Sequence, residues 1–367
     1  MSLPPIRVGF AGYGKFAQFL TKAWSSMEGV EVVAAASLHE EPKDLRLYKH
    51  YDGLLKDEEV DLVAITAPPN LHAAIAGSAM EAGKHVIIEK PVATALEDAK
   101  RLLETRDGTG RVAGVNFMMR FTPLAEIFAR WKEERPFGKL WRAVIENHAQ
   151  DETLPMEHWF WDTARSGGIL VEHAGHFFDL INSFTNANPG RVGGWSHRRS
   201  SGTQDRMLAT VAYDDGLTAS HYHTFSRPGF FERTTIRLWF ELAEIQLEGW
   251  IPISGKIYAL TTAATEPALA ILPHFQETER RTIAERTNSL PRNVTISGES
   301  FSVADEIEGN FEIGRSKMEV YTEAACAMLM DVRRGIADPN HKLRVPLEFG
   351  VEALRIAIEA SDDAAKA

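Results

Sequence analysis

Three short segments of this chain carry residue types at spacings that support chemistry. The first is the loop GFAGYGKFA at 9–17, where Gly12, Gly14 and Ala17 follow a Gly-x-Gly-x-x-Ala spacing. The first glycine permits a tight turn, the second lets the backbone approach a pyrophosphate, and the small alanine allows close helix packing. An apolar strand pattern precedes the loop and a helical pattern follows it, so the loop predicts a dinucleotide site at a helix amino terminus.

The residue that ends the second predicted strand bears on the choice between NAD and NADP. An acid at this position hydrogen-bonds the ribose 2′-hydroxyl of NAD, whereas this chain has Ser37. A serine removes the repulsion that an acid exerts on a 2′-phosphate, which favours NADP. Two alternatives stay open: Glu40 or Glu41 reaches the ribose instead, or Ser37 is a small strand-end residue with no cofactor role.

The second segment is Glu89-Lys90-Pro91, which directly follows a predicted buried strand. Open α/β sheets place ligands at the carboxyl ends of their strands, so Lys90 is expected to project toward the cofactor. Oxidation of an alcohol by hydride transfer also requires a base or proton relay, which a positioned lysine can supply. Pro91 restricts the backbone and can take a cis peptide bond. The alternative interpretation of Lys90 is an ordinary surface lysine.

The third segment is a helix predicted over 166–184, with an apolar stripe and a separate polar stripe. Glu172 and His176 lie four residues apart on the polar stripe. Contact between them would orient the imidazole and raise its proton affinity. Asp179 on the same stripe is expected to anchor the helix, and a solvated helix face is the alternative interpretation.

The predicted helices and strands that position these segments indicate an α/β fold. Short apolar runs alternate with helical patterns through the first 120 residues, as in a parallel sheet covered by helices. Strands rich in Val and Ile without polar alternation are typical of a doubly wound sheet buried on both faces. The predicted strands are 7–11, 30–37, 61–66, 85–89 and 112–117, and the predicted helices are 15–26, 72–82 and 94–105.

After about residue 120 the pattern changes to longer strands, several with alternating polarity. The turn Asp214-Asp215-Gly216 between two of them predicts a hairpin and therefore antiparallel pairing. We expect a dinucleotide-binding domain over 1–120 and an α+β domain over 121–367 with a mainly antiparallel, open sheet. Its predicted strands are 138–148, 206–213, 217–225, 234–240 and 244–247, and its predicted helices are 317–334 and 347–361, with loops and short strands over 261–310.

Five segments of the chain together match one known pattern. They are GFAGYGKFA at 9–17, AITAPPNLHA at 64–73, IIEKPVATALEDAKRLLE at 87–104, VNFMMRFTP at 115–123 and SGGILVEHAGHFFDLI at 166–181. They resemble the Gfo/Idh/MocA family of nicotinamide-dependent oxidoreductases, whose most specific short mark, EKP, is present unaltered. The resemblance implies an amino-terminal Rossmann domain, a second domain with an open antiparallel sheet, and a sugar, cyclitol or related polyhydroxy substrate.

The resemblance also implies site residues. Lys90 is expected to be the catalytic lysine and His176 a substrate ligand and proton relay, with Glu172 standing where the family usually has aspartate. The predicted cofactor contacts, from the loop and the resemblance together, are Gly12, Tyr13, Gly14, Lys15, Phe16, Ser37, Ala67, Pro68, Asn70, His72, Glu89 and Lys90. The predicted substrate contacts are Asn116, Arg120, Trp159, Glu172, His173 and His176. Asn116 and Arg120 have loop or surface roles as alternatives, Trp159 a packing role, and no metal is expected.

Composition and charge narrow the classes of function. The chain has 367 residues, with 40 Lys plus Arg against 51 Asp plus Glu, a formal net charge of −11 that disfavours a nucleic-acid partner. The single cysteine, Cys326, excludes a disulfide within the chain. We see no secretory signal and no apolar run long enough to span a membrane, so a cytoplasmic protein is expected.

The sequence therefore predicts an NAD(P)-dependent oxidoreductase that moves a hydride between nicotinamide and a secondary alcohol or ketone. Two alternatives stay open: a redox-assisted glycoside-cleaving enzyme with tightly bound NAD, and a non-catalytic cofactor-binding sensor. The intact Lys90 and His176 argue against the sensor, which would need neither. An open sheet with an apolar face needs covering, so a homodimer or homotetramer is expected.

Overall fold

The computed structural model describes residues 3–39, 42, 44–283 and 292–366. Glu40 and Glu41, the alternative ribose partners, lie outside the described residues. The chain forms two compact units, of which the first comprises Met1–Phe121, Leu154–Asp179 and Tyr321–Asp362, and the second comprises Thr122–Thr153, Leu180–Val320 and Asp363–Ala367. This division differs from a single boundary at residue 120, because two later segments pack with the amino-terminal part.

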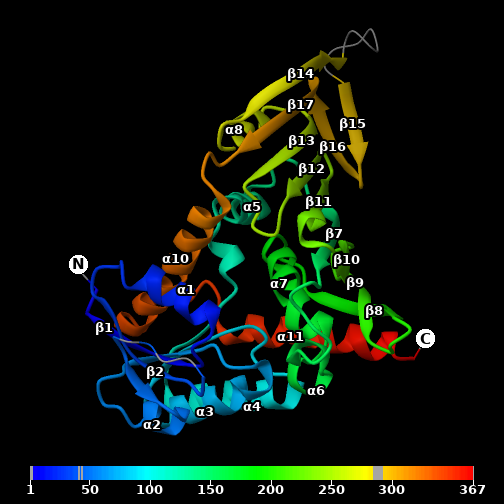
Figure 1. Cartoon of the computed structure of the whole chain (residues 1–367). Coiled ribbons are helices and arrows are strands. Elements are labelled where there is room, and N and C mark those ends of the chain that lie inside the picture. Colours follow the sequence, from blue (N-terminus) through cyan, green and yellow to red (C-terminus); the bar gives the residue numbers. More distant parts are fainter. Residues whose placement is uncertain (1–2, 40–41, 43, 284–291, 367) are drawn as a thin grey trace. The chain divides into compact units, whose positions relative to one another are not determined.

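A six-stranded parallel sheet forms the centre of the first unit. Its strands are β1 (Ile6–Ala11), β2 (Val30–Ala36), β3 (Arg46–Tyr48), β4 (Leu62–Ile65), β5 (His85–Ile88) and β6 (Ala113–Val115), in the spatial order β3-β2-β1-β4-β5-β6 (Figure 1). Apolar side chains such as Val8, Val63 and Ile88 are fully buried. The strand order changes direction between β1 and β4, which is where open α/β sheets bind ligands. The predicted doubly wound sheet is confirmed.

Helices cover both faces of this sheet, with α1 and the first-unit part of α10 on one face and α2, α3 and α4 on the other (Figure 1). The bounds are α1 (Lys15–Trp24), α2 (Tyr51–Leu55), η1 (Pro69–Leu71), α3 (His72–Glu81), α4 (Leu96–Thr109), η2 (Met118–Phe121), η3 (Trp159–Trp161), α6 (Thr163–Ser166), α10 (Lys317–Ala337) and α11 (Leu347–Ala364). The strand β3 and the helix α2 are not predicted from the sequence, because three and five residues are too few to establish a period.

Trp24 joins the first helix to a segment from the far end of the chain. Its ring is fully buried and stacks on Phe10 with ring centroids 5.5 Å apart. Its indole N–H donates to the carbonyl oxygen of Ala325 in α10 at 3.0 Å, across 301 positions of sequence. A buried indole needs such an acceptor, so α10 packs in a defined register on α1.

The helix predicted over 166–184 differs from the structure at its start. Gly167 and Gly168 have φ of +79° and +89° and end α6. A Cβ at Gly167 would lie 2.4 Å from Val171, so the position requires glycine. The chain then continues as the π-helical turn η4 (Leu170–Ala174) and as α7 (Gly175–Ser183). The helical segment therefore begins after Gly167 and Gly168, and hydrophobic periodicity does not indicate this boundary.

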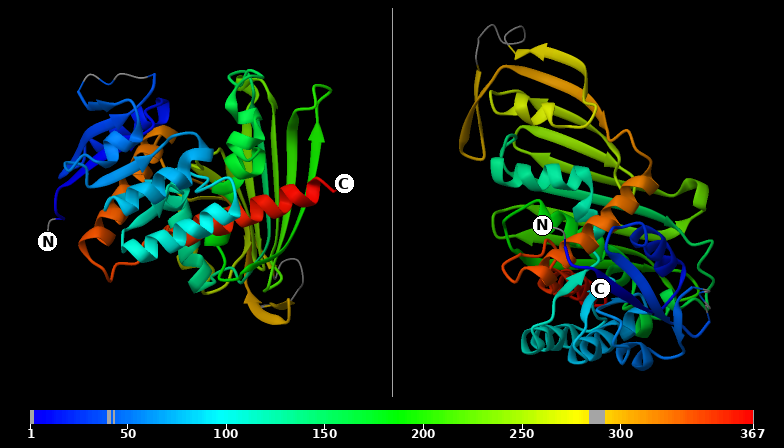
Figure 2. Two further views of the ribbon diagram at one scale, coloured as in Figure 1. Left: turned by 90° about the horizontal axis from the view of Figure 1, so that it is seen from below. Right: turned by 90° about the vertical axis from the view of Figure 1, so that its left-hand side faces the viewer.

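A nine-stranded sheet dominates the second unit (Figure 2). Its strands are β7 (Leu140–Gln150), β8 (Pro189–Arg198), β9 (Gln204–Tyr213), β10 (Thr218–Arg227), β11 (Arg233–Phe240), β12 (Ala243–Glu248), β13 (Ser254–Leu260), β14 (Gln276–Thr282) and β17 (Asp305–Glu312), in the order β14-β17-β13-β12-β11-β7-β10-β9-β8. Every neighbouring pair is antiparallel except β7 and β10. The predicted antiparallel sheet and the β9–β10 hairpin are confirmed.

The edge strand β8 is not predicted from the sequence, because its first residues, Pro189 and Gly190, are typical helix stop signals. Proline is tolerated as the first residue of an edge strand, because no hydrogen bond to a neighbouring strand needs its missing N–H. The remaining elements are α5 (Pro123–Glu134), η5 (Gly229–Phe231), α8 (Thr265–Ala270) and the hairpin of β15 (Arg292–Ile296) and β16 (Glu299–Val303). Within the described residues, no helix combines the length and apolarity that a bilayer crossing requires.

We expect Trp24→Ala to lower the free energy of unfolding by about 3–5 kcal/mol, because it removes a fully buried indole and leaves a cavity. Phe230→Ala is the control, since this residue of η5 is 92% exposed and its loss is expected to change stability by about 0.5 kcal/mol. Urea denaturation followed by circular dichroism measures both. Equal losses for the two variants would contradict the proposed packing of α1 on α10.

Candidate active site at the carboxyl edge of the parallel sheet

The loop between β1 and α1 places its two glycines where geometry requires them. Gly12 has φ of +94°, and a Cβ there would lie 2.6 Å from the backbone nitrogen of Ala67. A Cβ at Gly14 would meet nothing within 4 Å, so this residue faces open space. Gly14 is also the N-cap of α1 and has no side chain to occupy the amides of the first turn. The loop therefore fits a dinucleotide pyrophosphate.

The other predicted cofactor residues near this loop differ in exposure. Lys15 and Asn70 are exposed, whereas Tyr13, Phe16, Ala67 and Pro68 are half-buried. The hydroxyl of Thr66 donates to the carbonyl oxygen of Gly12 at 2.7 Å. This bond and the Gly12–Ala67 approach bring the loop after β1 against the loop after β4.

Ser37 lies at the carboxyl end of β2 and is 9% exposed. Its backbone N–H donates to the carbonyl oxygen of Tyr48 on β3 at 2.9 Å. Arg46, on the same strand as Tyr48, forms ion pairs with Asp57 and Glu59. The positive charge of the Arg46 guanidinium is therefore balanced by two carboxylates.

Lys90 and Glu172 form an ion pair at the carboxyl end of β5. The Lys90 ammonium donates to Glu172 Oε1 at 2.8 Å and also to the carbonyl oxygen of Glu172. The two side chains are only 12% and 15% exposed. The peptide bond between Lys90 and Pro91 is cis. The structure thus brings the second and third chemical segments together across 82 positions of sequence.

His176 is buried one turn after Glu172, with its ring 5.7 Å from that of Phe117 in an edge-on arrangement. Burial first, and then the positive charge of Lys90, hold the pKa of His176 well below its usual value. The expected rise in proton affinity from Glu172 is therefore wrong: the Glu172 carboxylate is paired with Lys90, and His176 is neutral at physiological pH. Burial and Lys90 likewise lower the pKa of the neighbouring His173 to about 3.

Glu89 and Asn116 form a second polar pair next to Lys90. The Asn116 side-chain amide donates to Glu89 Oε1, and Asn116 is 1% exposed. Burial raises the pKa of Glu89 to about 7, although the Asn116 hydrogen bond and the charge of Lys90 act in the opposite direction. Near neutral pH this carboxyl group therefore exists in both protonation states. Asn116, expected as a substrate ligand, has Glu89 as its partner.

Tyr321 is the site residue that the sequence analysis missed. It belongs to α10, and its ring stacks on Phe19 with centroids 4.7 Å apart. Burial raises its pKa, and the negative charge of Glu89 adds to this rise, which places the phenol near the Glu89 carboxyl group. Tyr321 is the one aromatic residue of α10, and no motif in its local sequence marks it as part of a site.

Arg120, expected as a substrate ligand, forms an ion pair with Asp179. The guanidinium donates to the two carboxylate oxygens of Asp179 at 2.6 and 2.7 Å, and it lies 4.3 Å from the ring centroid of Phe349. Asp179 is 1% exposed. This bidentate pair joins η2 to α7, so Asp179 anchors the helix and the polar stripe is not a solvated face.

His72 lies inside the structure and links two loops of the site. Its Nδ1 is 2.7 Å from the carbonyl oxygen of Pro91, and its Nε2 is 2.7 Å from the carbonyl oxygen of Ala67. The residue is 1% exposed, and burial lowers its pKa. His72 thus connects the loop after β4 to the loop that carries Lys90. Trp159, in η3, is half-buried with its ring 5.2 Å from that of His158.

These groups can hold and move a proton. Lys90 carries a positive charge, His176 is neutral, and Glu89 titrates near pH 7. They surround the carboxyl end of β5, on the same edge of the sheet as the phosphate loop. This combination suits general acid–base chemistry on a substrate beside a bound dinucleotide.

Two family models together match more than half of the chain. Residues 6–117 match an oxidoreductase family with an NAD-binding Rossmann fold. Residues 130–243 match the GFO/IDH/MocA C-terminal domain. The first match covers the parallel sheet and its phosphate loop, and the second covers the first strands of the antiparallel sheet.

Curated proteins of known name are similar over parts of the chain. A 1-carboxy-3-chloro-3,4-dihydroxycyclohexa-1,5-diene dehydrogenase of Comamonas testosteroni is 27% identical over 261 residues, 66% of this chain and 64% of that protein. An inositol 2-dehydrogenase of Salmonella typhimurium is 32% identical over 127 residues, 32% of this chain and 38% of that protein. The match spans less than two thirds of either relative's length.

Among solved structures, levoglucosan dehydrogenase in complex with NADH and levoglucosan has a TM-score of 0.76 and 17% sequence identity. The alignment covers 99% of this chain and 98% of that one. At this identity the likeness establishes the fold, a Rossmann unit followed by a unit with a mostly antiparallel sheet.

We expect the Glu89→Gln variant to become more stable relative to the wild type as pH rises from about 4.5 to about 7. The folded protein holds the Glu89 proton up to about pH 7, whereas a free glutamate releases it near 4.5. In the wild type, the contribution of this raised pKa to the free energy of unfolding is therefore fully present below pH 4.5 and is lost as the pH rises through 7. The neutral amide of the Gln variant does not titrate, so the variant has no such loss. Urea denaturation at several pH values measures the difference, with Glu97→Gln, at an exposed position of α4, as the control. A difference that does not change with pH would contradict the raised pKa.

Proposed function

The chain belongs to the Gfo/Idh/MocA oxidoreductase family, and from this premise we propose that it is an NAD(P)-dependent dehydrogenase or reductase acting on a hydroxyl or keto group of a sugar, cyclitol or related polyhydroxy compound. The observation that carries the proposal is the Lys90–Glu172 pair, which lies on the same sheet edge as the open phosphate loop. The names of the relatives, which include an inositol dehydrogenase and a levoglucosan dehydrogenase, support the substrate class.

In the proposed reaction, the bound nicotinamide supplies the hydride acceptor or donor. In the reducing direction the Lys90 ammonium donates a proton from its Nζ to the substrate carbonyl oxygen, and in the oxidising direction the neutral Lys90 amine takes the proton of the substrate hydroxyl. Glu172 holds Nζ in place. His176, kept neutral by burial and by Lys90, accepts a hydrogen bond from the substrate or relays its proton. His173 and Trp159 are the proposed further substrate contacts.

Arg120 and Asn116 act in this proposal through the residues they hold. Arg120 fixes α7 by its bonds to Asp179, and Asn116 fixes the Glu89 carboxyl group. His72 positions the backbone on both sides of the cofactor site. The proposed direct cofactor contacts are Gly12, Tyr13, Gly14, Lys15, Phe16, Ser37, Ala67, Pro68, Asn70, Glu89 and Lys90.

We also propose that copies of this chain associate through the antiparallel sheet. Trp141, Trp195 and Tyr258, on β7, β8 and β13, are 48%, 46% and 43% exposed. Aromatic side chains of this size on strands of one sheet favour burial against a partner. A homodimer or homotetramer is the proposed assembly, and light scattering of the purified protein tests it.

We expect Lys90→Met to lower kcat by about 10²- to 10⁴-fold, because it removes the proton-transfer group. Reduced-nicotinamide absorbance is followed with NAD and NADP separately over a panel of inositols, anhydrosugars, aldoses and keto sugars. Lys100→Met, on the exposed side of α4, is the control and should keep the wild-type rate. Cofactor binding without turnover of any panel member would count against net oxidation, and a fully active Lys90→Met would remove the proposed role.

We propose a preference for NADP, supported by Ser37 in place of an acid at the end of β2. Ser37→Asp is expected to lower the ratio of kcat/KM for NADP to that for NAD by about 10- to 100-fold, because the carboxylate repels the 2′-phosphate. Ser37→Ala is the control for loss of the hydroxyl alone. An unchanged ratio in Ser37→Asp would place the 2′-position away from this residue.

A further inference from the structure

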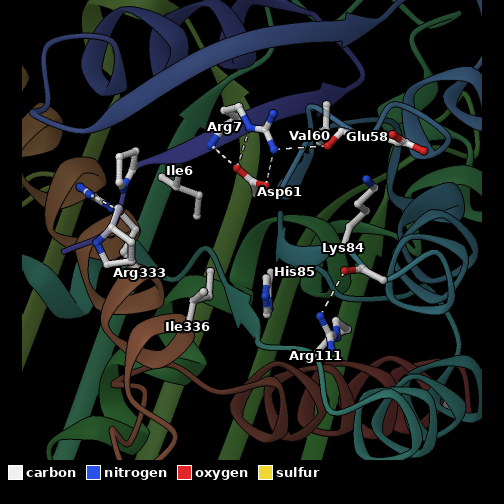
Figure 3. A pocket seen from close by; sticks show the side chains of 13 residues that line it. Ile6, Arg7, Glu58, Val60, Asp61, Lys84, His85, Arg111, Arg333 and Ile336 are labelled. Carbon is white, nitrogen blue, oxygen red and sulfur yellow. Dashed lines mark hydrogen bonds and ion pairs between the residues drawn. The ribbon is translucent and has the colours of Figure 1, made fainter.

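A cavity of about 560 Å³ lies at the amino-terminal edge of the parallel sheet (Figure 3). Its lining includes Ile6 and His85, which begin β1 and β5, and Arg111, which shortly precedes β6. The phosphate loop is at the opposite end of β1, and a strand of six residues spans about 17 Å. The cavity is therefore separate from the candidate active site.

Lys84 and Arg111 line this cavity, and both donate hydrogen bonds to backbone carbonyl groups. The Lys84 ammonium donates to the carbonyl oxygen of Asp57 at 2.7 Å. Arg111 donates to the carbonyl oxygens of Gly83 and Thr109, each at 3.3 Å. Both side chains are half-buried, and among the described residues neither forms an ion pair. The hydrogen bonds of both cations thus go to neutral backbone groups, and Lys84 also interacts with the charge of Asp61.

Arg333 of α10 is a third cation in the lining and is 3% exposed. Its two terminal nitrogens donate to the carbonyl oxygens of Glu28 and Pro4 at 3.0 and 2.9 Å, while its buried Nε has no hydrogen-bond partner within the described part of the chain. Burial lowers the pKa of Arg333, although the negative charge of Glu28 acts in the opposite direction. A nearby anion would stabilise this buried charge.

The acidic and imidazole groups of the lining do not balance these cations. Asp61 forms an ion pair with Arg7, which donates to its two oxygens at 3.0 and 2.9 Å, and it interacts more weakly with the charge of Lys84. Burial and the charge of Arg111 lower the pKa of His85 to about 4, so His85 is neutral near pH 7. Glu58 is the remaining acid, and it is exposed. The cavity therefore carries excess positive charge on a chain with a net charge of −11.

We propose that this cavity binds a small oxyanion, the phosphate group of a metabolite or inorganic phosphate itself. Planar guanidinium groups and an ammonium group around one hollow match the donor requirement of a phosphate. The volume exceeds that of the ion alone, so an attached organic group can be accommodated. The proposal concerns the amino-terminal edge of the sheet and does not depend on the proposed oxidoreductase function.

Isothermal titration with inorganic phosphate, at constant ionic strength set by chloride, tests the proposal. The phosphate loop at Gly14 is a second anion site, so the titration is repeated with saturating NADP. We expect phosphate binding to persist with NADP and to weaken at least tenfold in Arg111→Gln and in Lys84→Gln. Lys100→Gln, an exposed residue of α4, is the control and should bind as the wild type does.

Glycerol phosphate and glycerol, titrated in parallel, separate an organic phosphate from the free ion. Tighter binding of glycerol phosphate than of inorganic phosphate supports a metabolite, and equal binding supports the ion, while glycerol alone should not bind. Loss of all phosphate binding in the presence of saturating NADP would overturn the proposal. Phosphate binding that is unchanged in both Arg111→Gln and Lys84→Gln would also overturn it. Circular dichroism verifies that each variant is folded.

Discussion

The ion pair between Lys90 and Glu172 is the interaction on which the geometry of the candidate site depends. It holds the turn η4 against the loop after β5, although the two residues are 82 positions apart. Because both side chains are largely buried, removing one partner would leave an uncompensated charge, which typically destabilises a protein by about 3–5 kcal/mol. The Arg120–Asp179 pair fixes the same helical segment a few residues later, so the position of His176 is determined from both sides.

The charge of Lys90 also organises the protonation states around it. It adds to burial in keeping His173 and His176 neutral, and it opposes the effect of burial on Glu89. The site therefore contains a fixed ion pair, neutral imidazoles and one carboxyl group that titrates near pH 7. Groups whose pKa values are shifted apart in this way can divide the roles of acid and base.

The parallel sheet has two chemically different edges, because all of its strands run in the same direction. At the carboxyl edge, glycines and a helix amino terminus leave room for an anionic dinucleotide. At the amino edge, Lys84, Arg111 and Arg333 surround a hollow with side-chain cations. The first edge uses backbone groups that the loop spacing predicts, whereas the second depends on side chains from three separate segments.

The sequence by itself determined the fold class, the phosphate loop and the placement of Lys90 at a strand end, because each depends on a local period or spacing. Only the tertiary structure decided which groups pair. Glu172 pairs with Lys90, Arg120 with Asp179, and His72 with two loop carbonyls. The low pKa of His176 and the raised pKa of Glu89 likewise follow from burial and from charges brought close by folding. Such contacts join residues far apart in the chain, and local sequence patterns carry no information about them.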